Sequence, residues 1–325
     1  PHHLLLVPRS SMAAIDYSGS RVSAEYKDEF YSLVHKTHKT QAIWFLNGFW
    51  NEIGAEAENF WTFVLKFTEL CMSGRPSGED GCDLDEFEAH RFLESLGETL
   101  TVQAMRNKLR EIDVDFNKRV ALLEYAMFRY NKTVEQVVDA PQGDNQEAIA
   151  RAQEMVNAAS AAVDEMTRAL QEAKVAAETA RVNEQNAQRA EADQKVALET
   201  LHKEEEAYQN KIAALEAKAA KAGVQAGRAR AELNILNSED PLPLRRAKIN
   251  QEAAVRKALS ERKIAERTRV ESEAAAKAAA ESVSVAERSL EEAMAYLREQ
   301  KQSSGTAEGA IWWMEREIEE KKKYL

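Results

Sequence analysis

The sequence NQEAIARAQEMVNAASAAVDEMTRAL, residues 145–170, opens a segment rich in Ala, Glu, Lys, Gln and Arg that extends to Gln302. This composition is typical of a long helix or a coiled coil. Pro241 and Pro243, within NSEDPLPL at 237–244, mark the one certain break in the segment. The simplest interpretation is an antiparallel helical hairpin that turns at 237–244.

Apolar residues recur along the first arm at the spacing of a coiled coil. One column of every seventh residue begins at Ile149, and a companion column runs from Ala152 to Leu236. The pattern predicts one seam from Ile149 to Leu236 without a skip, covered by residues 244–302 returning antiparallel. Its polar exceptions are Glu184, Glu191, Gln194 and Glu205.

Residues 12–140 have a different composition, because tryptophan and phenylalanine are concentrated between Phe30 and Phe92. That density of large apolar side chains supports a compact core, which the alanine-rich segment cannot form. No alternating strand pattern of useful length occurs, so the fold class is all-α. Helices are expected over 23–38, 40–53, 57–71, 84–96, 101–112 and 122–130.

The chain is therefore expected to consist of four parts. They are an expression tag at 1–11, an EF-hand-type globular domain at 12–140, the antiparallel coiled-coil hairpin at 141–303 with its turn at 237–244, and a C-terminal tail with an amphipathic docking helix at 304–325. The net charge is −11 and no apolar run reaches the length of a membrane span. We expect a cytoplasmic protein without membrane contact, in which Cys71 and Cys82 are free thiols.

Residues 113–124, DVDFNKRVALLE, match the twelve-residue calcium loop of an EF-hand. Oxygen ligands fall at the required positions 1, 3, 5, 7 and 12, and they belong to Asp113, Asp115, Asn117, the backbone carbonyl of Arg119, and Glu124. Lys118 stands where glycine is usual and Ala121 offers no oxygen, so the expected affinity is on the order of micromolar to tens of micromolar. The cofactor is Ca²⁺.

A second loop is expected because EF-hands normally pair. Aligning Leu84 with Val120 places Glu88 at position 12 of a loop that spans 77–88. The front half of this loop is poor in ligands, since Ser77 and Gly81 occupy positions 1 and 5. We interpret it as a structural pseudo-loop, with weak binding through Asp80, Asp83 and Asp85 as the alternative.

The tail carries an apolar helical face beside two adjacent tryptophans. Docking of this helix on the protein itself is expected, and the residues that would make it are Ile311, Trp312, Trp313, Met314 and Ile318.

A basic segment dominates the charge distribution. Nine Lys and Arg residues stand against three Glu between Arg245 and Arg269. If the chain turns at 237–244, this segment lies beside Lys211–Leu236 and forms a basic hairpin tip suited to an acidic partner. Nucleic acid is not expected, because the tip offers no aromatic residue beyond Tyr208. No phosphate loop, nucleophile elbow or catalytic constellation is present, so the protein is not expected to be an enzyme.

Three stretches resemble the calcium-regulated 34 kDa actin-bundling proteins of amoebae. They are AIWFLNGFWNE at 42–52, the loop region 109–125, and GAIWWMEREIEEKKK at 309–323. The resemblance implies a cytoskeletal protein that binds and cross-links F-actin, with calcium reducing the cross-linking.

Under this resemblance, the acidic actin filament is the partner of the basic segment. The expected actin-binding residues are Arg245, Arg246, Lys248, Arg256, Lys257, Arg262 and Lys263. Bundling requires a second contact, from the globular domain, from Lys321–Lys323 or from self-association. The alternative is a calcium-sensing coiled-coil scaffold or adaptor that binds a protein other than actin.

Overall fold

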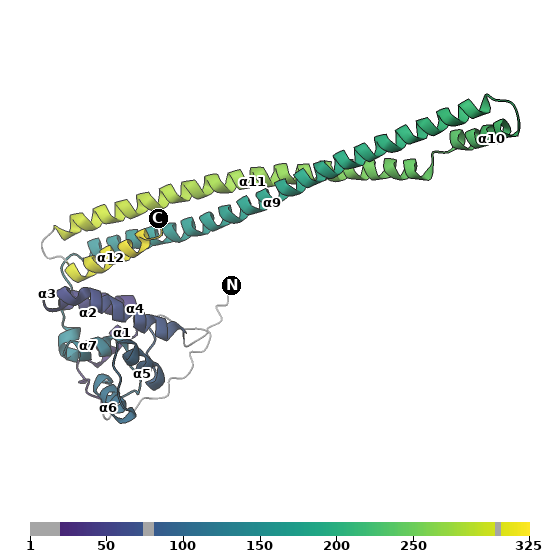
Figure 1. Ribbon diagram of the computed structural model, residues 1–325. Helices are drawn as coiled ribbons and strands as arrows, with labels where there is room; N and C mark the ends of the chain where they lie inside the picture. The colour runs from purple at the N-terminus through teal and green to yellow at the C-terminus, as the bar shows by residue number, and fades with distance from the viewer. Residues whose placement is uncertain (1–19, 74–80, 303–306) are drawn as a thin grey trace, which may run out of the picture. The chain divides into compact units, whose positions relative to one another are not determined.

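The computed structural model describes residues 20–73, 81–302 and 307–325. The predicted tag and the front part of loop 77–88, with Ser77 and Asp80, lie outside these ranges. Within them the protein is all-α, as predicted (Figure 1). No helix in the described ranges is both long enough and apolar enough to span a membrane.

Two units make up the chain. One comprises the residues up to Ser160 together with Ser289–Lys323, and the other comprises Ala161–Arg288 with the last two residues. The boundary between the units falls inside two long helices, α9 (Gln146–Ala219) and α11 (Leu242–Lys301). The predicted division of the chain at residues 140 and 303 therefore stays a prediction.

Short helices build the first unit. They are α1 (Lys27–Val34), α2 (His38–Gly48), α3 (Trp50–Ile53), the 3-10 turn Gly54–Glu56, α4 (Ala57–Ser73), α5 (Glu86–Ser95), α6 (Val102–Ile112), α7 (Leu122–Arg129), α8 (Val134–Val138) and the tail helix α12 (Glu308–Lys322). The predicted run 40–53 is divided at Phe49, whose φ of −121° is not helical. The sequence pattern missed α8, which has five residues and is held by a capping box from Thr133 to Gln136.

Aromatic side chains fill the core of this unit. Phe45 stacks on Phe60, with ring centroids 5.7 Å apart, and Phe92 meets Tyr125 edge to face at 4.7 Å. These rings come from α2, α4, α5 and α7, so one core fixes the positions of all four helices. The aromatic density between Phe30 and Phe92 thus correctly located the core.

The expectation of two free thiols is wrong. Cys71, near the end of α4, and Cys82 are joined in a disulfide, and their Cα atoms are 6.3 Å apart. Cys82 comes just before Leu84, which pairs with Val120, so the fold holds it beside α4. This proximity arises from tertiary packing, which the spacing of two cysteines in the sequence does not reveal.

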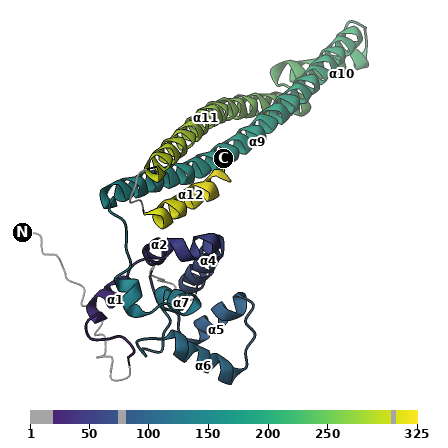
Figure 2. The ribbon, with the colours of Figure 1, turned by 90° about the vertical axis from the view of Figure 1, so that its left-hand side faces the viewer.

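The second unit is a helical hairpin, but the chain reverses earlier than predicted. The first arm ends at Ala219, Gly223 adopts a φ of +114°, and α10 (Val224–Ser238) runs back along α9. Both ribbon views show α10 beside the end of α9 (Figures 1 and 2). Tyr208 donates a hydrogen bond to the carbonyl of Leu236, and Leu215 packs with Ala229. The predicted unbroken helix to Leu236 is therefore wrong. The prolines near 241 separate α10 from α11 within the returning arm.

The seam of α9 also differs from the predicted columns. The companion column is kept, as Ala159, Met166 and Ala187 are buried. The first column is kept only at its start, where Val156 and Val163 are buried. From Leu170 to Leu198 its members are exposed, and the residue before each of them, such as Asn183 or Ala190, faces inward instead. The shift begins before the column becomes acidic, so the cost of burying a carboxylate does not account for it.

Gly223→Ala is expected to weaken the hairpin reversal. Its φ of +114° with ψ of −178° belongs to a region that only glycine adopts readily, so a side chain there costs about 1–3 kcal/mol. Thermal unfolding followed by circular dichroism should show a lower midpoint. Gly227→Ala is the matched control, because Gly227 lies within α10 with open space around it and alanine should stabilise that helix. Equal effects of both changes would contradict the assigned reversal.

Candidate functional site

Three buried carboxylates converge in the loop between α6 and α7. Asp113, Asp115 and Glu124 each place an oxygen within 4.8 Å of the others, and all three residues are less than a tenth exposed. They are three of the five predicted calcium ligands. The structure thus brings together positions 1, 3 and 12 of the predicted loop.

The loop backbone is folded around these carboxylates. Asp113 accepts hydrogen bonds from the backbone N–H groups of Asn117 (3.1 Å) and Lys118 (2.9 Å). Glu124 accepts from Val114 and from Ala121 N–H, both at 2.9 Å, one on each carboxylate oxygen. The carboxylates therefore point inward because the surrounding peptide groups hold them there.

The other two predicted ligands are the side chain of Asn117 and the backbone carbonyl of Arg119. Asn117 directs its side-chain nitrogen at Asp115 Oδ2, at 3.0 Å, so it becomes an oxygen ligand only if its amide turns over. The carbonyl of Arg119 stays a predicted ligand. Lys118 has a φ of +64°, the left-handed conformation expected for a residue that replaces the usual glycine.

Electrostatics favour a cation at this cluster. Burial raises the pKa of Asp113 to about 6 and raises the pKa of Glu124 well above its ordinary value. Negative charge from Asp115 adds to both shifts. Carboxylates gathered out of water repel one another, and an oxygen-ligated divalent cation removes that cost. The donor set, entirely oxygen, fits Ca²⁺, which Asp113, Asp115 and Glu124 would hold.

A second segment pairs with this loop as predicted. Leu84 and Val120 form an antiparallel bridge with two N–H to O hydrogen bonds of 2.9 Å. Glu88 accepts from the N–H of Asp85 as Glu124 does from Ala121, so the two segments share a local geometry. The alignment of Leu84 with Val120 is thus confirmed.

Two residues that the sequence analysis missed also support the loop. The Arg21 guanidinium donates to the carbonyls of Arg110, Glu111 and Asp113, which closes the C-terminal end of α6. Buried Gln41 of α2 accepts from the N–H of Leu123 at 3.1 Å. Both contacts join residues more than 80 positions apart, so no local pattern could have indicated them.

The predicted docking residues of the tail are spread around most of the circumference of α12, since residues 311–314 are consecutive in the helix. Ile311, Trp313, Met314 and Ile318 are buried and Trp312 is half-buried. Trp313 meets Trp61 of α4, with ring centroids 4.4 Å apart. Gly309 lies so close to α2 that a Cβ there would approach the backbone of Leu46 and Asn47 to 2.6 Å.

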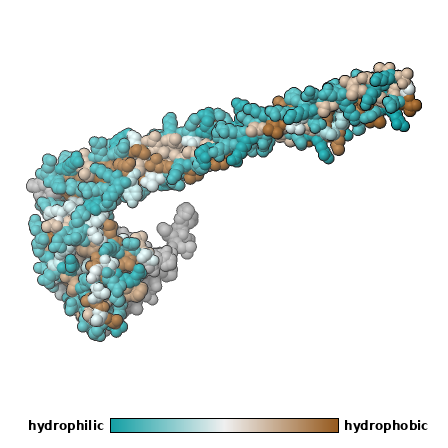
Figure 3. All heavy atoms as spheres, viewed as in Figure 1, coloured by the Kyte–Doolittle hydropathy of each residue, from teal (hydrophilic) through white to brown (hydrophobic). Residues whose placement is uncertain are grey.

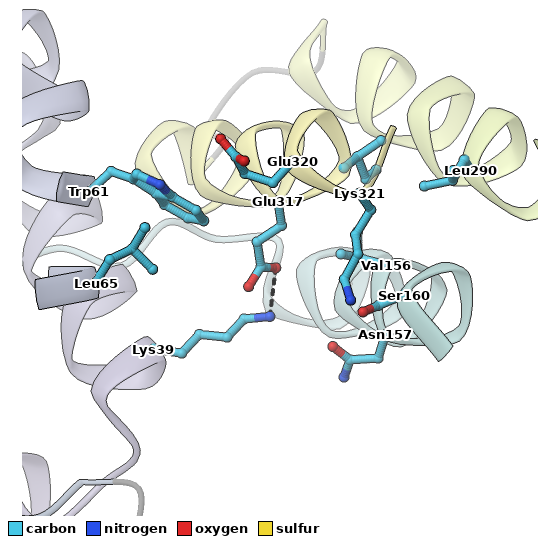
Figure 4. Close-up of a pocket in the computed structure, with 11 residues that line it drawn as sticks. Lys39, Trp61, Leu65, Val156, Asn157, Ser160, Leu290, Glu317, Glu320 and Lys321 are labelled. Carbon is cyan, nitrogen blue, oxygen red and sulfur yellow. Dashed lines mark hydrogen bonds and ion pairs between the residues drawn. The ribbon is translucent and has the colours of Figure 1, made fainter. Parts of the chain in front are cut away.

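Charged groups surround this contact. Glu317 pairs with Lys39 at 2.6 Å (Figure 4). Arg316 pairs with Glu58 at 3.0 Å and also lies over the Trp61 ring. A cavity of about 280 Å³ remains beside them, lined by Trp61, Leu65, Val156, Leu290 and Ile318 among others. Glu315 pairs with Lys301 at the end of α11, so α12 also binds the base of the hairpin.

The predicted actin-binding residues are all exposed on α11, but they do not form a hairpin tip. Lys257 pairs with Asp193 at 3.0 Å, and Thr268 meets Asn183. The basic segment therefore lies beside the middle of α9, and the predicted placement beside Lys211–Leu236 is wrong. The reversal at 220–223 moves α10 into that place.

Several of these cations have acidic neighbours. Arg245 pairs with Glu239, Lys248 with Asp240 and Arg256 with Glu252, all at the surface. Surface ion pairs contribute little to the free energy of folding, so acidic groups of a binding partner can replace the carboxylates in them. In the ranges that the structure describes, no carboxylate lies within 4.0 Å of the charged groups of Arg246, Arg262 and Lys263.

The outer surface of α11 has an unusual composition. The residues that face α9 repeat every seven positions, with Leu244, Ala258 and Ala265 in one column and Ala247 and Thr268 in the other. The column opposite this seam consists of Leu242, Ile249, Arg256, Lys263, Val270 and Lys277, all exposed. It contains no acidic residue, and Ile249 is 66% exposed. We call these six residues the outer column. Along the face that Figure 3 presents, brown apolar patches alternate with teal polar residues on the hairpin arms.

Comparison with known proteins shows that the chain is similar to actin-bundling proteins. Residues 159–293, which hold most of the hairpin, match the family described as F actin bundling C terminal. Over 93% of its length the chain is 26% identical to the calcium-regulated actin-bundling protein of Dictyostelium discoideum, covering 90% of that protein. A crystal structure of the 34 kDa F-actin bundling protein from the same organism matches 93% of the chain and 98% of its own, with 21% identity and a TM-score of 0.46. The resemblance to actin-bundling proteins stated from the sequence is confirmed.

Glu124→Gln is expected to weaken calcium binding by more than about tenfold, because it removes a charged, two-oxygen ligand from the cluster. Isothermal titration with Ca²⁺ measures the change, and circular dichroism checks that the fold is kept. Glu88→Gln is the matched control, since Glu88 occupies the equivalent position of the pseudo-loop. If Glu88→Gln abolishes binding while Glu124→Gln does not, the site is assigned to the wrong loop.

Gly309→Ala is expected to push α12 away from α2, at a cost of about 1–3 kcal/mol, since the added Cβ meets backbone atoms that cannot yield. Tryptophan emission should shift to the red as Trp313 becomes exposed, and the unfolding midpoint should fall. Lys322→Ala, at an exposed position of the same helix, is the control. A variant with wild-type emission and midpoint would show that the tail does not depend on this contact.

Proposed function

We propose that this chain binds and bundles actin filaments, and that calcium reduces the bundling. It acts in the cytoplasm, as part of the actin cytoskeleton, and it has no catalytic role. The family match over the hairpin and the similarity to an actin-bundling protein support the class of function. The calcium response is the more specific part of the proposal, and the buried carboxylate cluster supports it.

We assign the filament-binding surface to the outer column. In a coiled coil, the position opposite the seam is normally the most polar, because nothing covers it. Here it presents leucine, isoleucine and valine beside arginine and lysine, without a negative charge. Positive charge alone would give an association that salt weakens. Apolar residues at the contact add binding free energy to it. The actin filament, an acidic polymer, is the partner that the positive charge of this column fits, and the actin-bundling relatives support the same partner.

The predicted basic residues divide between this column and its flanks. Arg256 and Lys263 belong to the outer column, while Arg246 and Arg262 lie beside it. Lys257 and Lys248 are closer to acidic neighbours and contribute to the positive field. Bundling also needs a second filament contact, which the first unit, Lys321–Lys323 or self-association would provide.

Calcium would act on the hairpin through α2 and α12. A cation held by Asp113, Asp115 and Glu124 would draw the start of α7 inward, and Leu123 at that start is hydrogen-bonded to Gln41 of α2. The C-terminal end of α2 lies against Gly309 of α12, and Glu315 of α12 pairs with Lys301 of α11. Each step is a direct contact within the first unit, so a shift of α7 changes the base of the hairpin.

Ile249→Asp together with Lys263→Glu is expected to weaken filament binding by on the order of tenfold or more, since apolar and charged contacts are lost together. High-speed co-sedimentation with actin filaments in calcium-free buffer measures the dissociation constant. Arg288→Glu, which reverses one charge as Lys263→Glu does but at an exposed site of α11 away from the outer column, should leave binding within about twofold.

Unchanged pelleting of the double variant would rule out the outer column as the filament-binding surface. If the wild-type chain itself fails to pellet with filaments, the proposal of actin binding is wrong. The scaffold alternative predicts that second result.

A further inference from the structure

The contact between the end of α4 and the pseudo-loop places two cysteines and a histidine together. Cys71 is fully buried, His38 of α2 is 1% exposed, and Cys82 is half-buried. One ligand atom from each residue lies within 4.8 Å of the other two. A soft metal ion or a disulfide could occupy such a cluster, and the structure holds a disulfide.

His38 holds the backbone of Cys82 in place. Its Nε2 lies 3.0 Å from the carbonyl oxygen of Cys82. A carbonyl can only accept, so Nε2 carries the proton, and Nδ1 is the ring nitrogen with the lone pair that a metal would need. The ring packs edge to face on Phe67 of α4. The two sulfurs are joined to each other in the structure, so the disulfide is the chemistry that this cluster holds.

The structure fits the disulfide and leaves one of its cysteines partly exposed. The Cα separation of 6.3 Å lies within the range of a disulfide. Carbonyl oxygens lie 2.9 Å from Cys71 Sγ and 3.6 Å from Cys82 Sγ, and such oxygens can accept from a thiol. Because Cys82 is partly exposed, a small thiol can reach the bond, which favours an exchangeable disulfide over a purely structural one.

The disulfide is linked to the calcium loop through three residues. Cys82 is followed by Asp83, whose carbonyl accepts from the Arg119 guanidinium, and by Leu84, which is bonded on both sides to Val120. Val120 and Arg119 are positions 8 and 7 of the calcium loop. A covalent link at Cys82 thus limits the motion of the segment against which the loop is held.

We propose that Cys71 and Cys82 form a thiol–disulfide exchange site that sets the calcium affinity of the neighbouring loop. This inference rests on the calcium site of the proposed function. The disulfide holds residues 82–84 against α4, so the loop is already ordered when calcium arrives and binds more tightly. Reduction releases the segment and weakens binding. Disulfides of cytoplasmic proteins are usually transient and of this sensing kind.

The reactant is a low-molecular-weight disulfide such as oxidised glutathione. The thiolate of Cys82, which is the more exposed, attacks one sulfur of this disulfide and releases one small thiolate. Cys71 then attacks Cys82 Sγ, the protein disulfide forms, and the second small thiolate leaves. The two protons of the cysteine thiols end on the two released thiols. One small disulfide is reduced for each protein disulfide formed.

The test compares calcium affinity in the two redox states of the full chain. The protein is equilibrated with oxidised or reduced glutathione, peptide mass spectrometry reports the Cys71–Cys82 cross-link, and Ca²⁺ titration calorimetry gives the affinity. We expect the oxidised protein to bind calcium about fivefold more tightly than the reduced protein, or better still. About fivefold is the lower end of the coupling found between two sites in a protein. Cys82→Ser should bind like the reduced protein under both conditions.

Three results would overturn the inference. They are equal calcium affinities in the oxidised and reduced proteins, absence of the cross-link in the folded protein, and stoichiometric Zn²⁺ binding by the reduced protein that protects both thiols from a maleimide. The first two leave the calcium site standing, and the third reassigns the cluster to a metal. Absence of calcium binding in every form would instead remove the proposed calcium site, and this inference with it.

Discussion

Burial of like charges in the loop between α6 and α7 is the constraint on which this account depends. Asp113, Asp115 and Glu124 are drawn together out of water, and peptide N–H groups from the loop offset only part of the cost. Such an arrangement stores free energy that a divalent cation releases. Under the proposed function, calcium would tighten this loop and move the segments bonded to its ends.

Helix α2 is the element that would move with the calcium loop, because it contacts both that loop and the tail helix α12. One of its faces carries Gln41, bonded to Leu123 beside the calcium cluster, and its C-terminal end lies against Gly309 of α12. The same helix thus contacts the sensor and the tail, while α12 pairs with the base of α11. In the proposed function, filaments bind the outer column of the hairpin and calcium binds the loop between α6 and α7, so regulation and binding would use different surfaces. Calcium would then alter the hairpin without competing for the filament-binding residues.

The parts of the fold that were predictable are those set by local chemistry. Alternate oxygen ligands from Asp113 to Glu124 indicated the loop, and Val120 indicated its partner, because a calcium loop requires both within twelve residues. The aromatic density between Phe30 and Phe92 located the core. The outer column was also present in the sequence, but it could be recognised only after the buried residues of α11 fixed which side faces α9.

The predictions that failed concern features set by contacts between residues far apart in the sequence. The reversal at Gly223 was hidden because the heptad pattern continues through α10, and both sides of the turn have the composition of one helix. Arg21, Gln41 and the pairing of Cys71 with Cys82 arise from segments that meet only in the folded chain. The prolines near 241 were a true break, yet a break in a helix does not say whether the chain turns there.

Low-speed sedimentation of actin filaments at calcium concentrations below and above the micromolar range tests the central claim most directly. Filaments mixed with the wild-type chain should pellet as bundles at low calcium, and the pelleted fraction should fall as calcium fills the site at Asp113, Asp115 and Glu124. Equal pelleting of bundles across the whole calcium range would contradict the account.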